Sequence, residues 1–319
     1  MVLVSVILSS YNYANYIPDA IKSVLEQNVR DTELIIIDDC SKDNSREIIE
    51  SYKKRDARIR TIFHEENLGI ARTYNDGLDA AEGEYIALLD SDDVWKRNKL
   101  EKQLSILRKN DDLVVWSEGR IIDGEGKPTG QTFTQRQPGS RNRKSGDIFE
   151  LLLFNNFIFD SSLIVKRENI SHIRFDESLR YQNDYRFVVD LARNYTFYFI
   201  EEPLADYRVH GRNTILLDQD AARARAWLHD EVALRKYFLD KYPMKSRIRA
   251  DTLYRISTAY SALGESKLAR RFFLEGLNQK SPSFSSLLYF VTLLNSFVGT
   301  SLLKTYYNSY LYFLEKFSR

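Results

Sequence analysis

Apolar runs and stretches with helical spacing alternate along the first part of the chain. Four short segments rich in apolar and β-branched residues predict buried strands, at residues 3–9, 34–37, 59–63 and 85–89. The stretches between them predict helices, at residues 16–26, from 43 or 44 to about 55, and 71–81. Unbroken apolar strands that alternate with helices are typical of a parallel sheet covered on both faces. The chain is therefore predicted to begin with an α/β domain.

The pattern changes further along the chain. Residues 117–146 are polar and rich in Gly, Gln and Arg, which predicts a long loop, either a mobile lid or an ordinary solvated loop. Core segments, a helix and a strand are then predicted at residues 151–159, 163–165, 181–194 and 197–200. Only helical periodicity remains after about residue 216. We therefore predict an α/β domain over residues 1–215 and a helical domain over 216–319.

The helical domain carries one recognisable repeat. Five of its positions have the spacing of a single tetratricopeptide-like helix pair: Tyr260, Gly264, Ala269, Phe273 and Gly276. One pair cannot form a solenoid, because stacking needs neighbours. Residues 284–317 are rich in Leu, Phe and Tyr, which favours packing on the main domain and leaves partner binding or contact with a membrane surface open. Polar residues interrupt the segment 287–303, so we predict no spanning helix.

Composition and charge narrow the classes of function. The chain of 319 residues is 43% hydrophobic and 29% charged, as expected for a globular protein. Its 46 Lys and Arg against 45 Asp and Glu create no basic field, which argues against nucleic acid as a partner. The single cysteine, Cys40, excludes an intrachain disulfide and a cysteine-cluster zinc site. The short apolar start is not typical of a signal peptide, so we expect a cytoplasmic protein and leave attachment to the inner face of the membrane open.

Polar side chains follow three of the predicted strands, at the edge where parallel sheets bind ligands. Residues 9–12 follow the first strand, residues 38–41 the second, and residues 90–93 the fourth. Five carboxylates on two adjacent strand ends repel one another unless a cation or hydrogen-bond donors compensate. Mg²⁺ or Mn²⁺ bridging a diphosphate suits such oxygen ligands. The chain lacks the dinucleotide-binding, P-loop and nucleophile-elbow motifs. Without a glycine-rich loop whose amides bind phosphate, we expect a metal to neutralise the phosphate charge, as in sugar transfer from a nucleotide-sugar.

The motifs at these strand ends resemble glycosyltransferase family 2. The resemblance rests on residues 4–12, 33–45, 67–69 and 83–93, and it covers about residues 2–215. It implies the GT-A fold, an α/β fold with a mostly parallel central sheet, followed here by the helical region. It also implies an inverting, non-processive hexosyltransferase. The expected donor is a nucleotide-diphosphate sugar, with UDP as its nucleotide, and the expected acceptor is a hydroxyl of a glycan or lipid-linked molecule in cell-surface polysaccharide synthesis.

The resemblance also implies roles for single residues. The positions expected to bind the nucleotide-sugar are Ser9, Tyr11, Asp39, Asp90 and Ser91. Among these, Asp39 would accept the uracil N3–H, and Asp90 would lie near the ribose and the metal. The expected metal ligands are Asp92 and His210, the latter in a Tyr-Arg-x-His element. Asp184 is the expected general base, with a helix N-cap as the alternative.

Some positions depart from the family pattern or stay open. Tyr74 stands where the family often has Arg, with Arg72 nearby as a substitute, and Asn183 stands where Glu is commoner. Asp93 either caps the following helix or supports Asp92. Three further histidines lie in no motif and are interpreted as ordinary side chains: His64, His172 and His229. A catalytically silent scaffold and a nucleotidyltransferase are the alternative functions, and an oligomer is left open.

Overall fold

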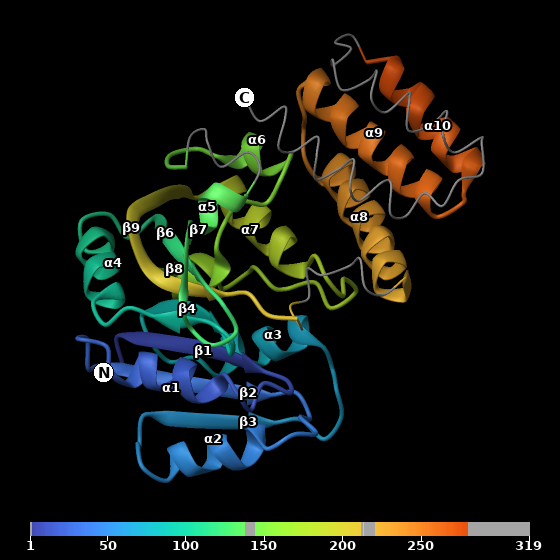
Figure 1. Ribbon diagram of the computed structural model, residues 1–319. Helices are drawn as coiled ribbons and strands as arrows, with labels where there is room; N and C mark the ends of the chain where they lie inside the picture. The colour runs from blue at the N-terminus through green and yellow to red at the C-terminus, as the bar shows by residue number, and fades with distance from the viewer. Residues whose placement is uncertain (1, 138–143, 212, 214–220, 280–319) are drawn as a thin grey trace. The chain divides into compact units, whose positions relative to one another are not determined.

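The chain forms two compact units in a computed structural model, which describes residues 2–137, 144–211, 213 and 221–279 (Figure 1). The first unit comprises Met1–Ile148, Phe157–Glu177 and Phe187–Gly211. The second comprises Phe149–Asn156, Ser178–Arg186 and Arg212–Arg319. The division of the chain at residue 215 remains a prediction, since the second unit also takes in two short internal segments.

Four parallel strands and three helices form the first part of the first unit. The strands are β1 (Val4–Ser10), β2 (Thr32–Asp38), β3 (Ile59–Phe63) and β4 (Tyr85–Asp90). The helices are α1 (Ile17–Leu25), α2 (Ser45–Lys53) and α3 (Ile70–Ala80). Both β1 and β2 are buried along their whole length, which explains why their sequences are apolar without alternation. The elements predicted for this region are confirmed, with ends that differ by a few residues.

The helices pack on both faces of this sheet. Right-handed crossovers place α1 and α2 on one face and α3 on the other. On its own face α3 lies very close to β1 at Gly77, where an added Cβ would lie 2.3 Å from Cγ2 of Ile7 and 3.0 Å from Cδ1 of Ile37. Only a residue without a side chain permits this approach, so Gly77 sets the distance between α3 and the sheet.

The remaining strands turn the sheet into a mixed one. They are β5 (Val94–Trp95), β6 (Leu113–Ile122), β7 (Pro128–Thr132), β8 (Ile164–Lys166) and β9 (Thr196–Arg208). In the described residues the strand order is β3-β2-β1-β4-β8-β6-β9-β5, and β7 pairs with β6. The β8 strand is antiparallel to β4 and β6, whereas β6 and β9 are parallel. The short helices α4 (Lys99–Leu107) and α5 (Phe133–Arg136) and the 3-10 turns η1 (Asp160–Ser162) and η2 (Arg167–Ile170) complete the unit.

The predicted loop over residues 117–146 is wrong for most of its described part. Residues 117–122 belong to β6, an interior strand, and they are followed by β7 and α5. The polar groups of β6 find partners inside the protein: Glu118 accepts hydrogen bonds from the backbone N–H (3.0 Å) and the hydroxyl of Thr134. A polar sequence therefore forms a buried strand because its partners are brought to it by the fold. Residues 138–143 lie outside the described residues.

The second unit is helical, as predicted for the C-terminal region. It contains α6 (Phe149–Leu152), the first turn of α7 (Asn183–Asn194), α8 (Ala221–Lys241), α9 (Ser246–Ala262) and α10 (Ser266–Leu277). Gly264 adopts φ +85° between α9 and α10, and a Cβ at Gly276 would lie 2.6 Å from the ring of Tyr254. These two positions account for the glycines of the repeat-like spacing, because one permits the turn and the other a close helix contact.

Two expectations concern membranes. The segment 284–317, including the interrupted apolar stretch 287–303, lies outside the described residues. Among the helices that the structure describes, none combines the length and the apolar character that crossing a membrane requires.

Candidate active site

The candidate nucleotide-binding residues and Asp92 lie at the carboxyl ends of three strands in the first unit, β1, β2 and β4. The strand register aligns Ser10 of β1 with Asp38 of β2, and Ser9 of β1 with Asp90 of β4. One correction follows. The two acidic strand ends are not adjacent, because β1 lies between β2 and β4. The five carboxylates therefore form two groups rather than one.

The first group lies in the tight turn that joins β4 to β5. The backbone N–H of Asp93 donates to the carbonyl of Asp90 (3.1 Å), which closes the turn. Asp90, Asp92 and Asp93 each place one carboxylate oxygen within 4.8 Å of the others. Asp93 is only 1% exposed, and burial, followed by the charges of Asp92 and Asp90, raises its pKa well above the usual value. Three converging oxygens under such mutual repulsion are ligands that a hard divalent cation stabilises.

The end of β9 closes over this acidic turn. Nε2 of His210 lies 3.1 Å from Oδ2 of Asp92, and the His210 ring stacks on Tyr16 with centroids 4.6 Å apart. The backbone N–H of Arg208 donates to Oδ1 of Asp93 (3.0 Å), and its Nε donates to the carbonyl of Asp92 (2.8 Å). The late motif and the acidic turn are therefore one structural element. Asp93 takes part in it as the acceptor for Arg208 and does not cap α4, whose N-cap is Asn98.

Two hydroxyl groups hold Asp90 from the other side. The phenol of Tyr74 donates to Oδ1 of Asp90 (2.5 Å), and Oγ of Ser9 donates to the same oxygen (3.3 Å). Burial, and then the charge of Asp90, raises the pKa of Tyr74 well above its usual value, so the phenol keeps its hydrogen. Arg72 does not take over this position, because its guanidinium pairs with Asp76 (2.9 Å).

The surrounding tyrosines report a negative electrostatic potential. Burial is the largest cause that raises the pKa values of Tyr13 and Tyr207, and the charges of the three acids of the turn raise them further. Both phenols therefore stay neutral around an anionic centre, and the potential favours a bound cation.

The second group of carboxylates follows β2 and accepts several hydrogen bonds from the protein itself. Asp38 accepts hydrogen bonds from the hydroxyls of Ser10 (2.9 Å) and Ser41 (2.6 Å). Asp39 accepts from the backbone N–H groups of Leu68 and Gly69 (both 2.8 Å) at the start of α3. Gly69 has φ +89°, a conformation that glycine adopts without strain. The Asn-Leu-Gly motif thus supplies amide donors to the Asp39 carboxylate.

The loops after β1 and β2 are fastened to each other. The backbone N–H of Asn12 donates to Oγ of Ser41 (2.9 Å), and Oδ1 of Asn12 accepts the N–H of Lys42 (2.7 Å). Asn12 and Cys40 have positive φ angles of 58° and 62°. Left-handed backbone at residues other than glycine costs about 1–3 kcal/mol each and concentrates at functional sites. The two left-handed residues lie directly after Tyr11 and Asp39 in the chain.

Comparisons with known proteins decide the class. The model of the glycosyl transferase family 2 matches residues 5–172. TuaG of Bacillus subtilis, whose name assigns it to teichuronic acid biosynthesis, is 34% identical over 225 residues, which are 70% of this chain and 86% of TuaG. The chain belongs to glycosyl transferase family 2. The resemblance inferred from the motifs is confirmed, and this family 2 member is a glycosyltransferase.

Two solved structures show the fold. Residues 1–349 of TarS from S. aureus, in complex with UDP-GlcNAc, match with a TM-score of 0.56 at 17% identity, over 96% of this chain and 92% of that one. The mannosyltransferase PcManGT from Pyrobaculum calidifontis, in complex with GDP-Man and Mn²⁺, matches with a TM-score of 0.57 at 16% identity, over 98% and 85%. The predicted GT-A fold is confirmed for this glycosyltransferase.

The other expected site residues of the glycosyltransferase, Tyr11, Ser91 and Asp184, differ in solvent exposure and in the compact unit to which they belong. Tyr11 is 45% exposed at the rim of the first unit, whereas Ser91 is only 2% exposed inside the acidic turn. Asp184 belongs to the second unit, where it is the second residue of α7, and its Oδ1 accepts the backbone N–H of Tyr185 (2.7 Å). A carboxylate in the first turn of a helix is stabilised by the amides and dipole there.

Ser161 and His64 contact site residues of this glycosyltransferase, although the sequence motifs did not point to either of them. Ser161 accepts the backbone N–H of Asp90 (3.1 Å), and its carbonyl accepts Nε1 of Trp95 (2.6 Å). His64 contacts Asp39 directly, with 2.7 Å between Nδ1 and Oδ1. The sequence could have pointed to His64, because this residue directly follows β3. Parallel sheets bind ligands at the carboxyl ends of their strands, and β3 is one of these strands.

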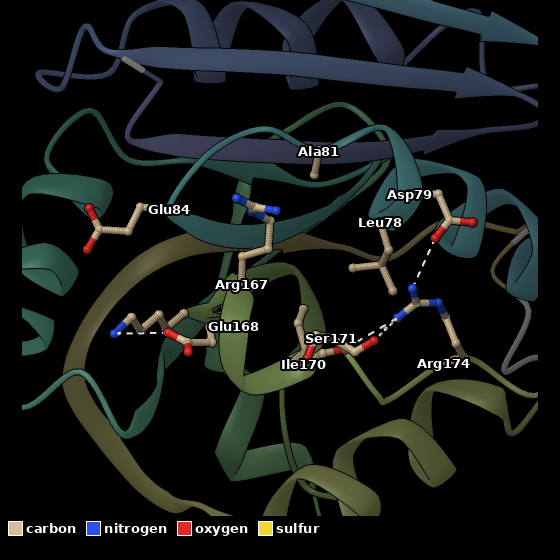
Figure 2. A pocket seen from close by; sticks show the side chains of 10 residues that line it. Leu78, Asp79, Ala81, Glu84, Arg167, Glu168, Ile170, Ser171 and Arg174 are labelled. Atoms are coloured by element: carbon tan, nitrogen blue, oxygen red, sulfur yellow. Dashed lines mark hydrogen bonds and ion pairs between the residues drawn. The ribbon is translucent and has the colours of Figure 1, made fainter.

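A cavity of about 580 Å³ lies elsewhere in the first unit (Figure 2). Its lining includes Glu84, directly before β4, whereas Asp90 ends that strand, so the cavity and the acidic turn lie at opposite ends of β4. Several of its charged side chains form ion pairs: Arg174 with Asp79 (3.0 Å), and Lys166 with Glu168 (3.6 Å) and Asp111 (2.5 Å).

Proposed function

We propose that this glycosyltransferase is metal-dependent and inverting, and that it moves one sugar from a UDP-sugar to a hydroxyl of a glycan or lipid-linked acceptor. The observation that carries the proposal is the convergence of Asp90, Asp92 and Asp93 within 4.8 Å at the strand edge, with His210 on Asp92. No amide cradle for phosphate lies in this turn among the described contacts, so the diphosphate needs a cation.

The residues present fit Mn²⁺ or Mg²⁺. Asp92 and His210 would hold the ion, with Asp90 beside it near the ribose. Carboxylate oxygens and an imidazole suit Mn²⁺ well, and the carboxylates alone suit Mg²⁺. Bound there, the ion would act as a Lewis acid that stabilises charge on the departing diphosphate.

The other nucleotide contacts follow from the strand ends. Asp39 would accept the N3–H of uracil, and Tyr11, exposed at the rim, would contact the nucleotide. Ser9 and Ser91 flank Asp90 and would complete the donor site by positioning that carboxylate and its turn.

Asp184 is the proposed general base. It would take the hydrogen of the acceptor hydroxyl while the acceptor oxygen forms a bond to the anomeric carbon. The bond from that carbon to the diphosphate oxygen breaks, and UDP leaves with the electron pair. Attack on the face opposite the leaving group inverts the anomeric centre.

The relatives support the donor and the setting. TarS is solved with UDP-GlcNAc, PcManGT with GDP-Man and Mn²⁺, and TuaG carries a name from teichuronic acid biosynthesis. We therefore propose UDP as the nucleotide and cell-surface polysaccharide synthesis as the setting. The reaction would take place in the cytoplasm, at the inner face of the membrane where the acceptor is lipid-linked.

A donor screen tests the proposal. Nucleotide-sugars are incubated with the protein and Mn²⁺ or Mg²⁺, and release of nucleoside diphosphate is measured with and without a chelator. Metal-dependent release from a UDP-sugar is expected. The absence of release from every donor under all metal conditions would instead support a catalytically silent scaffold.

A further inference from the structure

His64 lies between two carboxylates at the nucleotide side of the site. Its Nδ1 is 2.7 Å from Oδ1 of Asp39, and its Nε2 is 2.9 Å from Oδ2 of Asp76. The imidazole side chain is only 6% exposed, so water does not replace either contact. Asp39 follows β2, His64 follows β3 and Asp76 lies in α3, so the contact joins three elements.

The two contacts of His64 carry a condition on its ring. An ionised carboxylate only accepts hydrogen bonds, so both contacts are hydrogen bonds to ionised carboxylates when each ring nitrogen of His64 carries a hydrogen. That form is the imidazolium. Arg72 pairs with Asp76 at 2.9 Å, so an imidazolium at His64 would balance the charges of the two carboxylates. Glu177 approaches Arg72 at 4.0 Å from the exposed side.

The same contacts leave Asp39 with one open acceptor position. Oδ1 accepts from His64 and from the N–H of Leu68, whereas Oδ2 accepts from the N–H of Gly69 alone among the contacts of the described residues. A carboxylate offers about four lone-pair positions, so one position on Oδ2 remains. Three fixed donors leave the side chain little freedom to rotate, so that position has a defined direction.

We propose that His64, held as an imidazolium between Asp39 and Asp76, positions Asp39 so that its open acceptor binds the ring N–H of the donor nucleotide's base. This inference rests on the proposed function, in which Asp39 contacts that base. His64 is then a positioning residue that acts through Asp39. It controls the affinity for the nucleotide and the choice of base, and it leaves the rate of sugar transfer at the acidic turn unchanged.

The test uses a nucleotide that lacks the hydrogen in question. UDP and 3-methyl-UDP, in which a methyl group replaces the N3 hydrogen, are titrated calorimetrically into the full chain with Mn²⁺. Charge-assisted hydrogen bonds of this kind correspond to roughly ten- to hundredfold in affinity. The wild type is expected to prefer UDP by that factor. In His64→Leu, UDP binding is expected to weaken to the level of 3-methyl-UDP, whose own affinity stays the same.

A second variant separates positioning from folding. His64→Asn retains a side-chain N–H on the Asp39 side without the charge, and it is expected to recover part of the preference for UDP. His172→Asn, at an exposed histidine of the same unit, is the matched control and is expected to bind both nucleotides as the wild type does. In transfer assays His64→Asn is expected to raise KM for the donor with little change in kcat.

A spectroscopic measurement reads His64 without any ligand. Nitrogen-15 NMR of the histidine rings in the free protein, assigned with His64→Asn, is expected to show hydrogen on both ring nitrogens near neutral pH. A neutral ring would overturn the proposal. So would a His64→Leu variant that binds UDP as tightly as the wild type, or one that loses both nucleotides equally, which indicates a purely structural role.

The proposed function fails in a different way. If the wild type binds neither UDP nor another nucleoside diphosphate with Mn²⁺, the donor site itself is wrong and the inference falls with it. If the wild type binds UDP but His64→Leu leaves the preference over 3-methyl-UDP unchanged, only the inference is overturned.

Discussion

The two carboxylate groups at the strand edge differ in what compensates their charge. Asp39, after β2, is surrounded by donors from the chain, namely His64 and the N–H groups of Leu68 and Gly69. In the turn after β4, three carboxylates converge within 4.8 Å of one another, and burial raises the pKa of Asp93, although His210 and Arg208 also contact this turn. One carboxylate group is surrounded by donors from the chain, whereas the other gathers like charges whose repulsion a cation would reduce.

The difference indicates that the two carboxylate groups recognise different parts of the donor. A carboxylate with fixed donors and one open acceptor position recognises a neutral N–H by geometry. Crowded carboxylates attract a cation, which can in turn hold a diphosphate. We therefore expect the base to be recognised after β2 and the diphosphate after β4, with β1 between them carrying Ser9. Substitutions in the two groups should have separable effects.

The largest effect is expected for Asp92→Asn. An amide replaces a charged ligand, so Mn²⁺-dependent UDP binding is expected to disappear and transfer to fall by roughly 10⁴-fold, the equivalent of several kcal/mol of electrostatic stabilisation. Isothermal titration with Mn²⁺ and UDP, beside a transfer assay, measures both. Asp79→Asn, an exposed acid at the cavity of Figure 2, is the control and should behave as the wild type. Equal losses in the two variants would contradict the assignment.

Asp184→Asn should leave both groups intact and remove only the chemistry. UDP affinity is expected to be unchanged, whereas transfer to the acceptor should fall by about 10³-fold, as for the loss of a general base. Asp190→Asn in the same helix provides the matched control. Loss of UDP binding in Asp184→Asn would show that this residue belongs to the donor site instead.

Tyr74→Phe tests the hydroxyl that holds Asp90. The substitution removes the 2.5 Å hydrogen bond to Oδ1 and keeps the ring stacked on Phe175 at 4.9 Å. Because a hydrogen bond to a charged group is lost, UDP affinity with Mn²⁺ is expected to fall by about tenfold. Tyr198→Phe, at a 42% exposed position, controls for the loss of a hydroxyl. An unchanged affinity would mean that Asp90 needs no positioning.

The smallest effect within the turn is expected for Asp93→Asn. Oδ1 of the amide can still accept the N–H of Arg208, now 3.0 Å from the carboxylate, so the structure of the turn should persist. Turnover is expected to fall by about threefold or less, since the hydrogen bond from Arg208 is retained. A loss as large as that of Asp92→Asn would assign Asp93 to the metal as well.

Local patterns predicted the part of the site that lies in consecutive residues. The strands β1, β2 and β4 each contain a run of apolar residues, so the positions of Ser9, Asp39 and the acidic turn followed from the sequence. His210 followed from the family resemblance, and the structure places it 3.1 Å from Asp92, 118 positions away in the chain.

Long-range partners explain what was missed. His64 lies 25 positions from Asp39 and 12 from Asp76, so no local motif contains all three. Glu118 looked like a loop residue because its partner Thr134 lies 16 positions further on, yet together they form part of a buried strand and its neighbouring helix. Strand β9 extends over Thr196–Arg208, well beyond the apolar run at 197–200, because pairing with β6 stabilises its polar half.

The central claim is that the crowded group after β4 needs a divalent cation in order to hold the donor. The most direct test is the affinity of wild-type protein for UDP, measured by calorimetry with Mn²⁺ and again after removal of metal with a chelator. Binding in Mn²⁺ is expected to be tighter by at least roughly 100-fold, as the loss of a close charge pair implies. Equal affinity in the two conditions would contradict the account.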